Sequence, residues 1–167
     1  MTPDDIVVTR TGAWFKGRRF PCSLGRGGVV PPGAKREGDG ATPAGVLQIV
    51  GMLYRPDRMS PPSGWALSIG PGDLWSDDGN DPDYNHLVRA PHGFSHETLR
   101  RADPMYDLIL ITDWNWPDAV PGRGSAIFVH QWRRPGAPTA GCVAFSRPDL
   151  RWIAERVVPG TRLIIRA

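Results

Sequence analysis

The strongest constraint on the fold of this chain is the even spread of its glycines and prolines. The 167 residues include 20 Gly and 18 Pro, and these lie along the whole chain rather than in one linker. This distribution favours many short elements joined by turns, the pattern of a β-rich domain rather than a helical bundle. Apolar residues make up 40% of the chain, which is enough for a buried core. We therefore predict a mainly β fold.

Short apolar runs bounded by turn residues predict the strands. The expected strands cover residues 6–8, 13–15, 46–53, 108–111, 126–129, 143–145 and 161–166. The runs at 108–111 and 126–129 are continuous and apolar, which suits strands buried on both faces. Many short strands with little helix predict mixed sheets.

One helix is predicted by its capping pattern, and a second, shorter one over residues 95–101. For the first, Ser146 is the expected N-cap, Pro148 suits the first turn, and Leu150, Ile153 and Val157 fall on one face.

The chain length suits one domain, and no boundary divides it, so residues 1–167 are predicted to form a single domain.

The charge pattern argues against nucleic acid as a partner. Lys and Arg exceed Asp and Glu by 20 to 17, and no basic run is longer than two residues.

No apolar stretch approaches the length of a membrane span. The first residues lack the pattern of a signal peptide, so we expect a cytoplasmic chain or a mature or truncated form. The sequence leaves the oligomeric state open.

The sharpest chemical feature is a histidine and a cysteine that flank one loop. The predicted strand at 126–129 runs into His130, and a loop containing Pro and Gly then leads to Cys142 at the start of the next apolar segment. If these two strands are neighbours, the imidazole and the thiol lie close together. An imidazole within reach of a thiol takes its proton, and the imidazolium then stabilises the thiolate.

The residues around Cys142 support a catalytic role. Gly141 removes a side chain where a substrate carbonyl must approach, and the N–H groups of Gly141 and Cys142 are candidate oxyanion donors. The second cysteine, Cys22, has no base nearby in the sequence and is expected to be a buried thiol. Two cysteines are too few for a disulfide-stapled scaffold.

These residues resemble a known signature. A histidine, a loop and then Thr139-Ala140-Gly141-Cys142 resembles the catalytic motif of the YkuD-type L,D-transpeptidases, which cross-link bacterial peptidoglycan. Further segments that are similar to the family are 35–45 (KREGDGATPAG), 83–85 (DYN) and 106–115, in the expected order. The resemblance implies a β-sandwich of mixed sheets with one or two short helices.

The resemblance also implies roles and a reaction. Cys142 matches the nucleophile, His130 the general base, and Thr139 and Gly141 the supporting positions. The thiolate attacks the bond between an L-centre and a D-residue of a stem peptide, and the thioester passes to a diaminopimelate side-chain amine. No metal or organic cofactor is implied, and the partner is peptidoglycan. The family implies a place in the periplasm or cell envelope, and carbapenems as covalent probes.

This chain departs from the family pattern at two positions. Ala140 lies where many members have a second histidine, and Ala144 where an arginine or asparagine is common. These changes leave open which L-to-D junction is the donor, and hence whether 3→3 or 1→3 links form. Further candidates for substrate contact are Tyr84, Asn85, Trp132, Arg133 and His96.

Three alternatives remain at the level of sequence. Transfer of the acyl group to water would make the protein an L,D-carboxypeptidase. A non-catalytic module could keep the same fold and bind peptidoglycan without turnover. A zinc site built from His86, His92 and His96 is the third, although the HExxH pattern and paired cysteines are absent.

Overall fold

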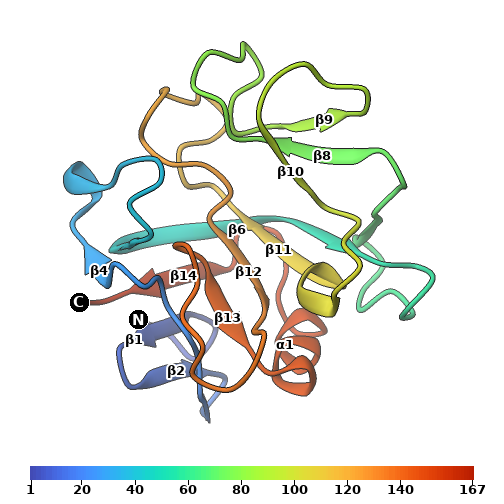
Figure 1. Cartoon of the computed structure of the whole chain (residues 1–167). Coiled ribbons are helices and arrows are strands. Elements are labelled where there is room, and N and C mark those ends of the chain that lie inside the picture. The colour runs from blue at the N-terminus through green and yellow to red at the C-terminus, as the bar shows by residue number, and fades with distance from the viewer.

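The computed structural model describes residues 1–167 and is built mainly of short strands (Figure 1). The strands are β1 (Ile6–Thr9), β2 (Gly12–Phe15), β3 (Arg18–Phe20), β4 (Val29–Val30), β5 (Thr42–Pro43), β6 (Gly45–Tyr54), β7 (Leu67–Ser68), β8 (Asp73–Ser76), β9 (Leu87–Arg89), β10 (His96–Thr98), β11 (Leu108–Thr112), β12 (Phe128–Gln131), β13 (Val143–Phe145) and β14 (Arg162–Ile165). The only α-helix is α1 (Arg147–Ala154), and η1 (Pro32–Ala34) and η2 (Pro104–Tyr106) are 3₁₀ turns. None of the helices has the length and hydropathy needed to cross a bilayer.

Most strands belong to one mixed sheet. Its order is β13-β12-β11-β6-β14-β1-β2-β3, with β7 paired to β6 beside this path. The long strand β6 joins the two halves, because residues 49–54 pair with β11 while residues 45–48 pair with β14. The two halves of the sheet are thus joined through the two ends of one strand, β6.

The two ends of this sheet meet. Ser23, just after β3, forms an antiparallel bridge with Ala144 of β13, with N···O distances of 2.8 and 2.9 Å. The rings of Phe20 and Phe145 pack edge to face nearby with their centroids 6.3 Å apart, within the range of about 4.5–7 Å that is usual for such pairs. The curled sheet encloses a core of 21 buried residues, to which α1 contributes Leu150 and Ile153.

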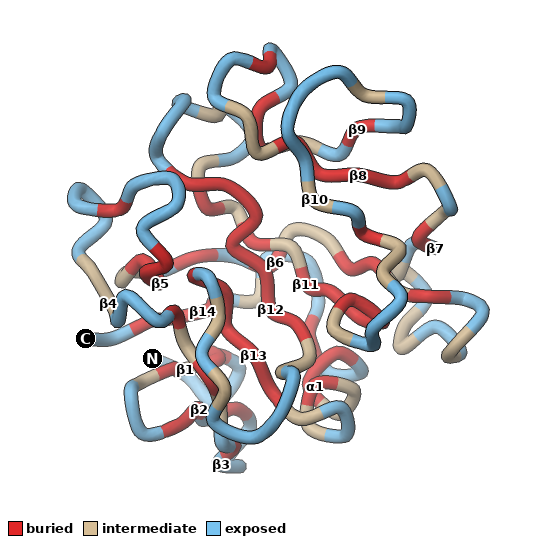
Figure 2. The backbone as a smooth tube through the Cα atoms, viewed as in Figure 1, coloured by how far each residue is buried: buried red, intermediate tan, exposed pale blue.

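A second, smaller core lies on the opposite face of β11 and β12. The three-stranded sheet β10-β8-β9, at the top of the view in Figure 1, covers this face. Trp75 of β8 packs edge to face on Phe128 of β12 with ring centroids 4.9 Å apart, and Tyr106 and Cys142 belong to the same group of nine buried residues. Figure 2 shows β8, β11, β12 and β13 as largely buried tube.

The sequence-based fold prediction is confirmed in class and in most elements. Strands occur in each of the predicted segments, and the side chain of Ser146 caps α1 by accepting from the Asp149 N–H. The predicted helix over residues 95–101 is wrong, because residues 96–98 pair with β8 as strand β10. The predicted strand start at Ala126 is also wrong. Ala126 has φ of 50°, which no strand residue adopts, and β12 begins at Phe128.

The segment 23–26 is held between two backbones that lead to the candidate site. Gly25 bridges to Thr139 on one side, and its N–H donates to Thr42 Oγ1 (2.8 Å) on the other. A Cβ added at Gly25 would lie 2.3 Å from the Gly40 carbonyl oxygen and 2.9 Å from the Thr42 nitrogen. Only glycine allows this approach.

We expect Gly25→Ala to lower the free energy of unfolding by about 3 kcal/mol, because two backbones would have to separate around the new methyl group. Gly33→Ala is the matched control, since nothing lies within 4 Å of a Cβ added there. Urea denaturation of both variants checks this. Equal stability of the two variants would contradict the close packing at Gly25.

Candidate active site

The parallel pairing of β12 and β13 places His130 and Cys142 on one face. Val129 lies opposite Val143 and His130 opposite Ala144, so Cys142 is level with Phe128. Side chains alternate along a strand, so Val129 and Val143 enter the larger core while Phe128, His130 and Cys142 face the other way. The Cα atoms of the histidine and the cysteine are then about 8 Å apart on a diagonal, from a strand spacing of ~4.8 Å and two residues of rise.

Both side chains line one cavity of about 330 Å³. Its wall also includes Tyr106 of η2, Glu97 of β10 and Lys35. The Tyr106 ring packs edge to face against the His130 imidazole at 5.3 Å, and the Tyr106 hydroxyl donates to Glu97 Oε2 at 2.5 Å. The cavity is therefore closed on one side by the smaller core.

Hydrogen bonds fix the tautomer of His130. Its Nδ1 lies 2.8 Å from the Gln131 carbonyl oxygen, which can only accept, so Nδ1 carries the proton. Nε2 makes no hydrogen bond within the protein and is left with its lone pair. Burial lowers the pKa of His130 to about 4, so the ring is neutral at pH 7. The Gln131 carbonyl is the group that orients the ring, which the sequence did not identify.

The thiol of Cys142 is also neutral at rest. Its Sγ–H donates to the Ala126 carbonyl oxygen at 3.1 Å, and Sγ accepts the Phe128 N–H at 3.4 Å. Burial raises the pKa of Cys142 to about 12, and the charge of Glu97 adds to the rise. No hydrogen bond joins Sγ to His130. The resting site is thus a neutral thiol beside a neutral imidazole, not the thiolate–imidazolium pair expected from the sequence.

Thr139 and Gly141 shape the turn before the cysteine. Thr139 Oγ1 donates to the Cys142 carbonyl oxygen (2.7 Å) and accepts the Gly141 N–H (3.1 Å). The Gly141 N–H is therefore engaged, whereas the Cys142 N–H makes no hydrogen bond within the protein. Gly141 has φ of 141°, and a Cβ there would lie 2.9 Å from the Ala41 carbonyl oxygen. Glycine is needed here for the backbone contact with residues 40–42.

The KREGDG segment is folded around an ion pair between the buried Lys35 and the more exposed Asp39. Lys35 is 2% exposed, and its Nζ donates to Asp39 Oδ1 (2.7 Å) and to the Arg36 carbonyl oxygen (2.6 Å). The same carboxylate oxygen accepts the Ala41 N–H at 2.8 Å. Lys35 thereby fixes the backbone that contacts Gly141, and its charge lowers the pKa of Cys142 against the effect of burial.

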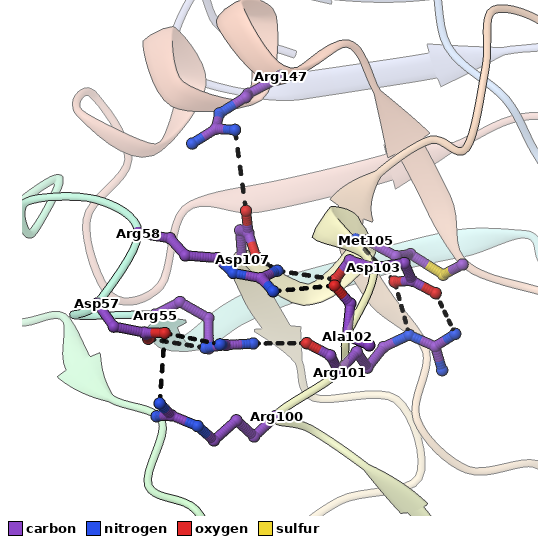
Figure 3. A network of polar contacts seen from close by, with 10 residues as sticks. All are labelled: Arg55, Asp57, Arg58, Arg100, Arg101, Ala102, Asp103, Met105, Asp107 and Arg147. Atoms are coloured by element: carbon purple, nitrogen blue, oxygen red, sulfur yellow. Dashed lines mark hydrogen bonds and ion pairs between the residues drawn. The ribbon is translucent and has the colours of Figure 1, made fainter.

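Hydrogen bonds from two arginines attach the segment that carries Tyr106 to the main sheet (Figure 3). Arg55 donates to the Arg101 carbonyl oxygen (2.6 Å), and Arg58 donates to the carbonyl oxygens of Ala102 (2.9 Å) and Asp103 (3.1 Å). Arg58 also pairs with the buried Asp107 at 2.8 Å. These contacts hold η2, and with it Tyr106, against His130.

The other sequence candidates divide into two groups. Trp132 and Arg133 line the cavity, and Arg133 is exposed and makes no ion pair. Tyr84, Asn85 and His96 are absent from its lining. Tyr84 is buried and donates to Glu37, Asn85 is 2% exposed, and His96 faces solvent with Nδ1 2.7 Å from the Phe94 carbonyl oxygen.

The histidines considered for zinc do not gather into a ligand set. His92 Nε2 pairs with Asp81 at 2.7 Å, and no cluster of three His, Cys, Asp or Glu side chains has the arrangement of a metal site. Cys22, the second free cysteine, is partly buried against the larger core, and burial raises the pKa of its thiol to about 11.

The model of the YkuD family, described as the L,D-transpeptidase catalytic domain, matches residues 6–165. This chain belongs to the YkuD family. The match spans nearly the whole chain, and at the level of the family it supports a transpeptidase-type acyltransferase.

No curated protein matches the chain. Among solved structures, an L,D-transpeptidase from Mycobacterium smegmatis is similar, with a TM-score of 0.45 and 15% identity. The alignment covers 97% of this YkuD domain and 58% of that chain, so the domain spans little more than half of that protein.

Acid should destabilise this YkuD domain through His130. The His130 imidazole binds a proton near pH 6.5 in the unfolded chain but only near pH 4 in the folded chain. The stability that the neutral imidazole contributes is therefore fully present above pH 6.5 and is lost as the pH falls from there through 4. The expected loss from this group is about 3 kcal/mol.

Urea denaturation of the wild type and of His130→Gln between pH 7 and pH 4 measures this loss, because other groups contribute equally to both. The variant should lose about 3 kcal/mol less over this range. The same pH slope in both proteins would contradict a buried neutral imidazole.

Proposed function

We propose that residues 1–167 form one catalytic domain, a peptidoglycan L,D-transpeptidase with Cys142 as nucleophile and His130 as general base. The observation that carries this proposal is that the two side chains face one cavity from adjacent strands, with an unengaged imidazole Nε2. Peptidoglycan lies in the cell envelope, and we propose that the enzyme acts there. No cofactor takes part in the proposed reaction.

The first half-reaction forms a thioester. As a stem peptide enters the cavity, the Cys142 proton passes from Sγ to Nε2 of His130, and Sγ bonds to the carbonyl carbon at the L-to-D junction. The Cys142 N–H is placed to donate to the developing oxyanion. The peptide C–N bond then breaks, and the imidazolium gives its proton to the leaving D-residue amine. Neutral starting groups are suited to this step, because the proton moves only when a substrate carbonyl is present.

The second half-reaction restores the thiol. The side-chain amine of a diaminopimelate on another stem attacks the thioester, and neutral His130 accepts the proton that the amine loses. The C–N bond forms, the C–S bond breaks, and the proton returns to Sγ. Attack by water in place of the amine gives the carboxypeptidase reaction.

The charges around the cavity suit a stem peptide with free carboxylates. Arg26 and Arg133 line the cavity and make no ion pair, whereas Arg101 is engaged by Asp103 at 2.6 Å. The two unpaired guanidinium groups are therefore available to a carboxylate of the donor.

We expect Arg133→Ala to raise KM for a tetrapeptide stem about fivefold to tenfold with little change in kcat, because one exposed ion pair contributes about 1 kcal/mol. Arg134→Ala is the matched control, since Arg134 is exposed and does not line the cavity. Steady-state kinetics of the two variants decides. Equal KM values would remove Arg133 from the binding site.

The proposed function is tested by incubating purified protein with disaccharide-tetrapeptide muropeptides and identifying the products by mass spectrometry. New dimers support transpeptidation, and their fragmentation distinguishes 3→3 from 1→3 links. Shortened monomers alone would indicate the carboxypeptidase, and unchanged substrate the non-catalytic module.

Cys142→Ala should abolish both product formation and the covalent carbapenem adduct, while Cys22→Ala should retain both. His130→Gln should lower the rate of acyl transfer by at least about a hundredfold, the usual contribution of a general base. Intact mass and product analysis check these outcomes. Equal losses in the two cysteine variants would overturn the assignment of Cys142.

A further inference from the structure

The Asn85 side chain has all of its hydrogen-bonding groups engaged within the protein. Its Oδ1 accepts from Trp75 Nε1 (3.0 Å) and from the Ala126 N–H (2.9 Å). Its Nδ2 donates to the carbonyl oxygens of Trp114 (3.0 Å) and Asn115 (2.7 Å). These four bonds join three parts of the chain: β8, the segment after β11 and the segment before β12. Because two partners can only donate and two can only accept, the orientation of the amide is fixed.

Ala126 lies between Asn85 and the thiol. Its N–H is bound by Asn85, and its carbonyl oxygen accepts the Cys142 Sγ–H at 3.1 Å. Its φ of 50° is in the left-handed region, which costs an alanine about 1–2 kcal/mol. A residue in this conformation persists only when its surroundings hold it. The bond from Asn85 is one such restraint, and it fixes the direction of the carbonyl that receives the thiol proton.

We propose that Asn85 is a positioning residue for Cys142, acting through Ala126 to hold the thiol S–H in a hydrogen bond to a backbone carbonyl until substrate arrives. This inference rests on the proposed function of Cys142 as nucleophile. Sγ is bracketed by the Ala126 carbonyl and the Phe128 N–H, so its side-chain rotamer is set before the reaction begins. In the step in which Sγ bonds to the substrate carbon, the S–H bond breaks, its hydrogen bond to the Ala126 carbonyl is lost, and the proton passes from Sγ to His130 Nε2.

The S–H stretching band in the infrared tests this directly, because a thiol that donates to a carbonyl absorbs at lower wavenumber than an unbonded thiol. The protein carries Cys22→Ala throughout, so that one thiol remains, and Cys22→Ala/Cys142→Ala provides the blank. The wild-type Cys142 band should be narrow and lowered. A band at the position of an unbonded thiol overturns the proposal without any variant of Asn85.

Asn85→Gly removes all four bonds while tolerating the backbone φ of 60°. We expect its S–H band to broaden and move to higher wavenumber, and its acyl-transfer rate to fall about tenfold. Asn85→Asp keeps an acceptor for the Ala126 N–H, so its band should stay near that of the wild type. Asn80→Gly is the matched control, because the exposed Asn80 bonds only to Asp78.

Thermal unfolding confirms that each variant is folded before its band is read. An unshifted band in folded Asn85→Gly overturns the proposal, and so does a shift of the same size in Asn80→Gly. If Asn85→Gly does not fold, the bands of the wild type and of Asn85→Asp decide. The band reports the resting thiol and needs no turnover. A protein with the expected bands but no cross-linking would therefore refute the proposed function and leave the positioning of the thiol intact.

Discussion

The candidate site depends on the register between β12 and β13. Pairing of Val129 with Val143 sends those two side chains into the larger core and leaves His130 and Cys142 on the opposite face. A slip of one residue in the pairing of β13 would turn each of its side chains to the other face of the sheet and would move the Cys142 thiol into the larger core. The bridge between Ser23 and Ala144 fixes the outer edge of β13, and the Phe145 side chain packs in the larger core. The closure of the sheet is therefore what holds the thiol and the imidazole in one cavity.

Burial acts on the two reactive groups in opposite directions but with one result. It raises the pKa of Cys142 and lowers that of His130, so both groups are uncharged at rest. A neutral pair has no stored thiolate to react with passing electrophiles. In the proposed reaction the charge is created during acylation, where the Cys142 N–H and the buried ammonium of Lys35 are already in place. Under that proposal the specificity of the reaction comes from the substrate that fills the cavity, because substrate binding and proton transfer are coupled.

The sequence was most informative where local patterns decide the structure. Apolar runs between turn residues predicted the strands, the Ser146 cap predicted α1, and the His130 to Cys142 spacing pointed to one cavity. It was least informative where the partners are far apart in the chain. The helix expected at 95–101 is a strand because β8 pairs with it, and Ala126 leaves the strand because Asn85, 41 residues earlier, binds its N–H. Nor did the sequence indicate that Lys35 is buried or that Asn85 lies beneath the cavity rather than in its wall.

The loop between β12 and β13 has a property that bears on how such enzymes diverge. Residues 133–136 are exposed, whereas His130, Gly141 and Cys142, at the ends of the loop, are buried and fixed by the sheet. Mutations, insertions or deletions in the middle of this loop can therefore alter the rim of the cavity while the reacting groups keep their positions. If the domain acts as proposed, selection for a new substrate can act on this surface without moving His130 and Cys142, so related proteins are expected to differ most in this loop.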